Sequence, residues 1–275
     1  MSRFVAEMLS DFGFDTVWPV GSYDALERAL LDGEAHAAWA PPVLCARVEA
    51  SGGAVPLRAV RMGAVSYRSA LLCRSERAID LKRLAEASGL APMRAAWVDP
   101  RSAAGCVMPR RFLRERGADL ELVLDEAYLG SYRACFDAVL EGDADLTATY
   151  VGRRGSGYID LCGDRAAELR VLGWTDEIPN DGVALSPTLP REVASAVANA
   201  IAAAFTGERS RDRLALALDA DGFDAPPAGT YAPIRELMAD APAGGAAADR
   251  PRRSRPHPGR RAAVMPPAQR RLATS

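Results

Sequence analysis

Lysine is almost absent from this chain of 275 residues, because Lys82 is the single lysine among 34 basic side chains and the others are arginines. Lys82 follows Asp80 in a polar stretch typical of the start of a helix, which argues against a Schiff-base lysine. The chain has two histidines, His36 and His257. This scarcity argues against a histidine metal site and against a Ser-His-Asp or Cys-His catalytic device. We therefore expect no metal, no cofactor and no catalytic residue.

Closely spaced cysteines are also lacking. The five cysteines lie roughly thirty residues apart without any C-x-x-C pair, at Cys45, Cys73, Cys106, Cys135 and Cys162. A disulfide framework or a zinc site would need closer spacing or histidine partners. We predict that the cysteines are small buried hydrophobic side chains.

Long apolar runs are missing, and no segment approaches the roughly 18 residues that cross a bilayer. The N-terminal segment MSRFVAEMLSDFG has no apolar core and no small-residue cleavage site, so the chain as written is expected to stay in the cytoplasm. The formal net charge is −2, but residues 1–240 carry −9 and residues 241–275 carry +7. The tail 241–275 is rich in Ala, Pro, Gly and Arg and is predicted to be disordered. It has no aromatic side chains to stack on bases, so we expect no nucleic-acid partner.

Helical and strand patterns alternate along residues 4–238. Helices are predicted at 4–9, 23–31, 41–50, 81–87, 106–116, 132–141, 190–205, 209–217 and 231–238, and strands at 14–20, 35–40, 55–62, 66–73, 94–98, 121–124, 145–150 and 169–174. The order helix, strand, helix, strand, helix at the start predicts an α/β fold with a parallel sheet and helical crossovers.

One loop could bind an anion. A buried strand ends at Asp99-Pro100, and the small residues Ser102, Ala103, Ala104 and Gly105 lead directly into a helix. Small side chains leave the first backbone N–H groups of the helix open, and the helix dipole adds partial positive charge. An ordinary tight turn capped by Ser102 would have the same sequence, so this loop alone leaves both interpretations open.

An ordered series of short motifs adds a resemblance to a known family. The motifs are Tyr23-Asp24-Ala25-Leu26, the segment Gly33 to Pro42 with Ala38-Trp39, Ser66-Tyr67-Arg68-Ser69-Ala70, Asp99 to Gly105 with Pro109, Gly130-Ser131-Tyr132, Ala144-Asp145, Ile178-Pro179-Asn180-Asp181, Gly222-Phe223 and Tyr231. Together they resemble the substrate-binding proteins of phosphonate-type ABC transporters, which bind phosphate, phosphite or phosphonates. The resemblance spans about residues 4–238.

The resemblance implies the type II periplasmic-binding fold, in which two doubly wound α/β lobes clamp the ligand in a cleft. Residues 1–92 and 184–240 would form the first lobe, residues 93–183 the second lobe, and residues 241–275 the disordered basic tail. The residues implied to bind the ligand are Tyr23, Tyr67, Ser102, Ala103, Ala104, Gly105, Tyr132 and Asp181. Asp181 matches a carboxylate that meets the amino group of an aminophosphonate.

This chain departs from the family pattern at four places. Ala103 and Ala104 stand where the family has more hydroxyls, and Tyr132 stands where the phosphonate binder has a histidine. Gly152 aligns with a second ligand carboxylate of the aminophosphonate binder. The family also begins with a strand before its first helix, so we expect that this strand, together with a signal peptide, lies upstream of Met1.

The resulting prediction is a binding protein that captures a small oxyanion between two lobes and delivers it to an ABC transporter permease. We expect a monomer. The family resemblance implies a periplasmic or membrane-associated location outside the cytoplasm, whereas the chain as written, without a signal peptide, would be cytoplasmic. Two alternatives stay open: an enzyme on the same fold, like the dehydratases of menaquinone synthesis, and a cytoplasmic ligand sensor.

Overall fold

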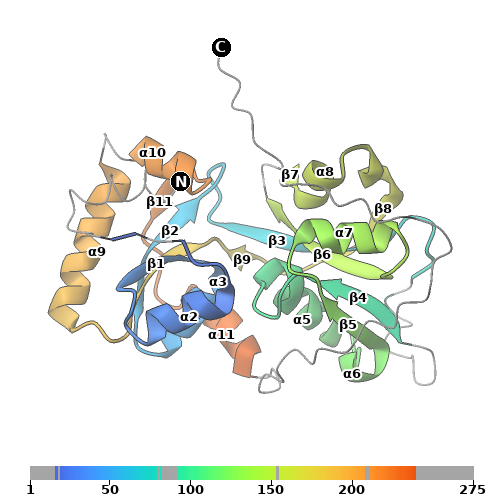
Figure 1. Cartoon of the computed structure of the whole chain (residues 1–275), viewed down its shortest axis with the longest axis horizontal. Coiled ribbons are helices and arrows are strands. Elements are labelled where there is room, and N and C mark those ends of the chain that lie inside the picture. The colour runs from blue at the N-terminus through green and yellow to red at the C-terminus, as the bar shows by residue number, and fades with distance from the viewer. Residues whose placement is uncertain are drawn as a thin grey trace, which may run out of the picture. The chain divides into compact units, whose positions relative to one another are not determined.

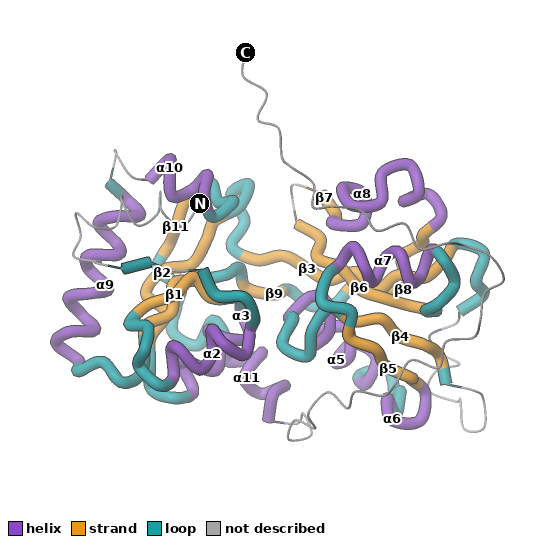
Figure 2. The backbone as a smooth tube through the Cα atoms, viewed as in Figure 1, coloured by secondary structure: helices purple, strands orange, loops and turns teal. Residues whose placement is uncertain are grey.

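The computed structural model describes residues 16–17, 19–79, 81, 92–152, 155–207 and 211–239, whose strands gather into two sheets (Figure 2). Several predictions lie outside these residues. They are the helix 4–9, the helix 81–87 apart from its first residue, the disordered tail 241–275 and the strand expected before the first helix. Within the part of the chain that is described, every helix is too short or too polar to cross a bilayer.

The first sheet has the strand order β1-β10-β2-β11, and all neighbouring strands are antiparallel. Its strands are β1 (Ala37–Ala40), β10 (Gly182–Leu185), β2 (Ala54–Val60) and β11 (Gly222–Asp224). The prediction of parallel neighbours at the start of the chain is wrong here. β1 and β2 do run in the same direction, but β10 lies between them, and a strand from so much later in the chain leaves no local signal.

The second sheet has the order β5-β4-β6-β3-β8, with β7 beside β6 and β9 beside β3. Its strands are β3 (Ser66–Arg74), β4 (Met93–Trp97), β5 (Leu124–Tyr128), β6 (Leu146–Gly152), β7 (Gly155–Ser156), β8 (Leu169–Trp174) and β9 (Ile178–Pro179). β4 is parallel to β5 and β6, whereas β3 is antiparallel to β6 and β8. β3 therefore belongs to the second sheet, although the predicted boundary counted it with the first lobe.

Helices cover both faces of each sheet (Figure 1). Around the first sheet lie α2 (Tyr23–Leu31), α3 (Pro42–Ala50), α9 (Arg191–Thr206), α10 (Arg211–Ala217) and α11 (Ala232–Ala239). Around the second lie the π-helix η1 (Ala103–Val107), α5 (Met108–Arg114), α6 (Leu120–Val123), α7 (Tyr132–Leu140), α8 (Gly157–Cys162) and the 3-10 helix η2 (Gly163–Glu168). We call each sheet with its helices the first lobe and the second lobe.

Local sequence explains where the two helices that face the site begin. The hydroxyl of Ser22 accepts the N–H of Ala25 at 3.2 Å, and the hydroxyl of Ser131 accepts the N–H of Ala134 at 3.2 Å. Serine is a strong N-cap because it satisfies an N–H group that the helix itself leaves open. The first residues of α2 and α7 after these caps are tyrosines, so capping places two aromatic hydroxyls at helix starts.

Two predicted strands differ in the structure. Residues 16–17 and 19–20 of the predicted strand 14–20 are irregular, and Pro19 has no N–H to donate to a strand partner. The predicted strand 121–124 is mostly helical turn, because Asp119 accepts the N–H of Glu121 and starts α6, and the strand begins only at Leu124.

The cysteines behave as predicted. All five are free, four are buried and Cys162 is partly exposed. Burial raises the pKa of Cys135 to about 11 and the pKa of Cys106 to about 12, so both thiols stay protonated near neutral pH. These cysteines act as apolar side chains in the core.

Two crossover segments connect the lobes. The chain passes from β2 to β3 through residues 61–65 and from β9 to β10 through residues 180–181. The side-chain amide of Asn180 donates to the carbonyls of Ala59 and Ala64, each at 3.0 Å, and its backbone N–H donates to Val65. The hydroxyl of the buried Tyr231 donates to the Asn180 carbonyl at 2.9 Å. This network holds the two crossovers against each other beside the site.

Candidate functional site

The Asp99–Gly105 loop forms the start of a helix, as its sequence predicts, but the first turn is wider than an α-helix. The N–H of Val107 donates to the Ser102 carbonyl at 2.9 Å, which is the five-residue spacing of a π-helix. Pro109 has no N–H to offer the Gly105 carbonyl, and that carbonyl accepts the N–H of Val98 instead. The turn continues directly into α5, so Ala103 and Ala104 begin a helical segment that ends at Arg114.

Ser102 and Gly105 support this turn from within. The Ser102 hydroxyl accepts the N–H of Gly105 at 3.1 Å, and the Ser69 hydroxyl donates to the Ala104 carbonyl at 2.6 Å. A Cβ atom on Gly105 would lie 2.7 Å from Cγ2 of Val98 and 2.8 Å from the Ser102 hydroxyl. The turn therefore needs glycine at this position, and Gly105 serves the shape of the site rather than its lining.

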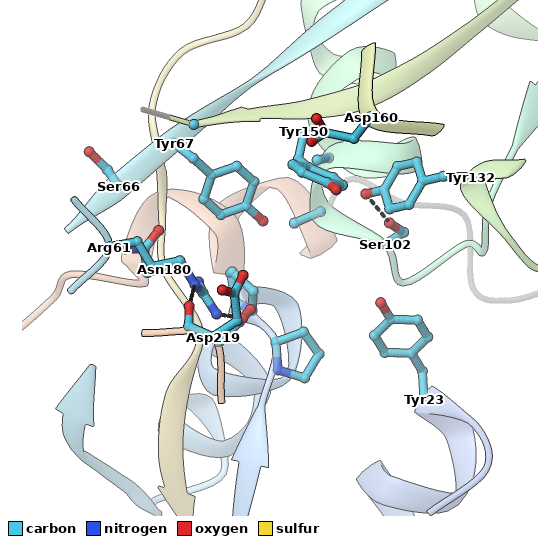
Figure 3. A pocket seen from close by; sticks show the side chains of 16 residues that line it. Tyr23, Arg61, Ser66, Tyr67, Ser102, Tyr132, Tyr150, Asp160, Asn180 and Asp219 are labelled. Carbon is cyan, nitrogen blue, oxygen red and sulfur yellow. Dashed lines mark hydrogen bonds and ion pairs between the residues drawn. The ribbon is translucent and has the colours of Figure 1, made fainter. Parts of the chain in front are cut away.

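Three hydroxyl groups converge at the start of η1 (Figure 3). The hydroxyls of Ser102 and Tyr132 are 3.5 Å apart, and Tyr23 points its hydroxyl toward Ser102 from the first lobe. Tyr132 also packs edge to face against Tyr150, with ring centroids 5.3 Å apart. Burial raises the pKa of Tyr23, and the carboxylates of Asp181 and Asp99 raise it further. Burial likewise raises the pKa of Tyr132, so both hydroxyls remain hydrogen-bond donors well above neutral pH.

A cavity of about 430 Å³ opens in front of this turn. Both lobes and both crossovers contribute side chains to its wall. They are Tyr23, Pro41, Pro42, Arg61, Ser66, Tyr67, Ser102, Ala103, Ala104, Tyr132, Tyr150, Gly152, Asp160, Asn180, Asp181 and Asp219. Of the eight residues that the resemblance implies, seven line this cavity. The eighth is Gly105, which lies behind the turn.

The implied residue Asp181 is already paired inside the protein. A guanidinium N–H of Arg61 donates to the Asp181 carboxylate at 2.8 Å, and the same guanidinium also donates to the carbonyls of Asp219 at 2.7 Å and Leu218 at 3.4 Å. Burial raises the pKa of Asp181, although Arg61 opposes that rise. Arg61 thus neutralises Asp181 before any ligand arrives.

Tyr67 lies between the hydroxyls of Ser102 and Tyr132 on one side and Arg61, which pairs with Asp181, on the other (Figure 3). It is half-buried at the start of β3. Burial raises the pKa of Tyr67 well above its usual value, with further contributions from Asp181 and the neighbouring tyrosines. A neutral hydroxyl here can serve as donor or acceptor across the middle of the cavity.

Nine residues of the cavity wall are not among the implied ligand-binding residues, and four of these nine were not named at all in the motifs or departures: Arg61, Tyr150, Asp160 and Asp219. Tyr150 ends a predicted strand, at the edge where ligands often bind in α/β proteins, and that was a usable signal. Arg61, Asp160 and Asp219 come from a crossover, a short helix and a loop whose meeting depends on tertiary structure. The described residues hold no cluster of three His, Cys, Asp or Glu side chains placed for a metal ion.

Solved structures of binding proteins share this architecture. A binding protein component of an ABC phosphonate transporter from Pseudomonas aeruginosa superposes with a TM-score of 0.66 at 18% identity, covering 86% of this chain and 78% of the other. PhnD1 from Prochlorococcus marinus, in complex with methylphosphonate, has a TM-score of 0.62 at 16% identity, with 86% and 89% covered. A TctC solute-binding protein from Polaromonas gives 0.53 at 12% identity, with 87% and 92% covered. The shared architecture is the type II periplasmic-binding fold.

The family itself is decided by sequence. No curated protein matches the chain significantly. The profile described as "ABC transporter, phosphonate, periplasmic substrate-binding protein", however, matches residues 12–231, which is most of the chain. That family consists of transport proteins and not of enzymes. The chain therefore belongs to the periplasmic substrate-binding proteins of phosphonate ABC transporters.

Proposed function

We propose that this protein binds a small oxyanion of the phosphonate, phosphite or phosphate type at the start of η1. The observation that carries the proposal is the convergence of the Tyr23, Ser102 and Tyr132 hydroxyls on the first turn of that helix, inside a cavity. The first N–H groups of a helix have no acceptor within the helix. Together with the helix dipole and the hydroxyls they can surround an anion with donors.

The charges of the cavity favour a singly charged anion. Among the described residues, its wall holds one cationic side chain, Arg61, and three carboxylates, Asp160, Asp181 and Asp219. Arg61 is paired with Asp181 at 2.8 Å, so the part of the wall that the structure describes leaves no unpaired cation to balance a second negative charge on the ligand. Hydroxyls and amides then hold the anion by hydrogen bonds, which are strongest where the acceptor is ionised.

The size of the cavity supports a small ligand. A volume of about 430 Å³ lies toward the lower end of the usual range for small-molecule sites. Tyr67 and Tyr150 offer apolar ring surface to a short organic group attached to the anion. Gly152, where the aminophosphonate binder has a carboxylate, leaves one side of the cavity without that acceptor.

We infer the remaining features of function from the family. The protein would close its two lobes on the ligand, bending at the crossovers 61–65 and 180–181, and would then deliver the ligand to a membrane permease outside the cytoplasm. It would act as a monomer and catalyse no reaction. The lobe division would follow the sheets, with residues 66–179 forming the second lobe and the rest of residues 1–240 the first.

The test is a thermal-shift screen of the full chain followed by isothermal titration calorimetry. Methylphosphonate, phosphite, phosphate and methanesulfonate are compared, because they share a tetrahedral oxyanion but differ in charge. A ligand at a hundredfold its dissociation constant should stabilise the fold by about 2.7 kcal/mol. We expect a shift with at least methylphosphonate. If all four anions leave the melting curve unmoved, the proposed function is wrong.

A further inference from the structure

A cluster of four charged side chains joins the two lobes at the rim of the proposed site. Arg101 comes from the loop after β4, and it donates to Glu27 at 3.1 Å and to Asp24 at 2.6 Å, both on α2. Arg47 on α3 also pairs with Glu27. We call Asp24, Glu27, Arg47 and Arg101 the rim cluster, and Arg101 is its member from the second lobe.

The rim cluster adjoins two of the hydroxyls that would hold the anion. Arg101 directly precedes Ser102, and Asp24 and Glu27 follow Tyr23 by one and four positions on α2. The N–H of Arg101 donates to the Asp99 carboxylate at 2.8 Å, which fixes the backbone of the loop. The ion pairs therefore hold the helix that carries Tyr23 against the loop that carries Ser102.

The contacts of Arg101 with Asp24 and Glu27 can break and re-form at low cost, because each carboxylate also has a cation in its own lobe. Glu27 is only 6% exposed, and a buried carboxylate without a partner would be strongly destabilising. Arg47 lies in the same lobe as Glu27 and remains its partner if Arg101 leaves. Asp24 is half exposed and retains Arg28 at 3.6 Å. Separation of the lobes thus strands neither carboxylate without a cation.

We propose that Arg101 is a positioning residue of the binding site, which holds Tyr23 over the Ser102 turn and thereby sets how long the anion stays bound. This inference rests on the proposed function. Arg101 is not among the described residues that line the cavity, so its proposed effect on the ligand is indirect. Its contacts with Asp24 and Glu27 join the two lobes, so they stabilise the arrangement in which Tyr23 lies over the Ser102 turn relative to one with the lobes apart. The rate of ligand release should depend on Arg101 more than the rate of ligand entry does.

The experiment compares Arg101→Gln with Arg165→Gln. Arg165 forms a forked ion pair with Glu168 within the second lobe, at 2.8 Å and 3.2 Å, and serves as the matched control. Dissociation of methylphosphonate is followed by stopped-flow tyrosine and tryptophan fluorescence. We expect R101Q to speed dissociation about tenfold, as the loss of two charge-assisted hydrogen bonds predicts, and R165Q to leave it unchanged. Arg101→Lys should restore part of the slow release, since lysine keeps the charge but not the fork.

A purely structural role predicts a different pattern. If R101Q lowers the melting temperature of the ligand-free protein and leaves the dissociation rate at the wild-type value, the proposal is overturned. A rate for R101K as fast as that for R101Q would also contradict it, since the charge itself would then have no effect.

A measurement without ligand separates failure of this inference from failure of the proposed function. Spin labels at Glu121→Cys and Glu192→Cys, both exposed and one in each lobe, report the distance between the lobes in a Cys162→Ser background. We expect R101Q to shift the distances to longer values than wild type. If no anion binds the wild-type protein, the proposed function fails, and this distance still decides the role of Arg101: an unchanged distribution overturns it.

Discussion

The substitution Ser102→Asp tests the proposed anion site most directly. Aspartate is as good an N-cap as serine, so it can accept the N–H of Gly105 as Ser102 does at 3.1 Å, and the turn should survive. The new carboxylate would lie beside the expected position of the bound anion, at a charge separation of about 4 Å. Two negative charges at that separation repel by about 4 kcal/mol at the effective dielectric constant of a partly buried site. The affinity for methylphosphonate should fall about a thousandfold.

Isothermal titration calorimetry of S102D and wild type at the same ionic strength measures this loss. Ser131→Asp is the matched control, because Ser131 caps α7 in the same way but is exposed and lies outside the cavity lining. We expect S131D to bind within a few-fold of wild type, since water screens its charge. Methylphosphonate binding by a folded S102D protein at near wild-type affinity would refute the reasoning and move the anion away from this turn.

Three further predictions follow from the same geometry. Gly105→Ala should lower the free energy of unfolding by about 1–3 kcal/mol through overpacking against Val98, whereas Gly21→Ala, with nothing within 4 Å of the new Cβ, should change it little in chemical denaturation. Asp181→Asn frees Arg61 and should strengthen methylphosphonate binding several-fold in calorimetry; weaker binding would mean that Asp181 itself contacts the ligand. Burial raises the pKa of Tyr132, so the contribution of this side chain to stability is full below pH 10 and is lost as the pH rises further and the buried hydroxyl ionises. The free energy of unfolding, measured by denaturation between pH 9 and 12, should therefore depend less steeply on pH in Tyr132→Phe than in wild type.

Much of the local structure could be predicted from sequence patterns. The helix Tyr23–Leu31 and the strand Leu169–Trp174 begin and end where the periodicity predicts. The order of the first sheet could not be predicted, because Gly182–Leu185 inserts between two strands that precede it by more than a hundred residues. Hydrophobic periodicity reports which face a strand buries, but not which strand lies beside it.

The candidate site also has features that the sequence indicates and a feature that only the structure shows. The small residues of the loop from Asp99 to Gly105 fit either an anion-binding helix start or an ordinary turn capped by Ser102, and the motif order links Tyr23, Tyr67 and Tyr132 to one family. The pairing of Arg61 with Asp181 could not be predicted, because the two residues lie on different crossovers. That pairing changes the expected chemistry, since the carboxylate implied to meet an amino group is already neutralised by an arginine.

The sequence by itself therefore determined the class of fold and the family, because local periodicity and an ordered series of motifs indicate them without any knowledge of contacts in space, and it predicted a turn on which an anion could sit. Only the tertiary structure decided which charges face that turn and which ion pairs span the lobes. Coulomb energies depend on separation in space and on burial, and the contact between Arg101 and Glu27 joins residues that are more than seventy positions apart.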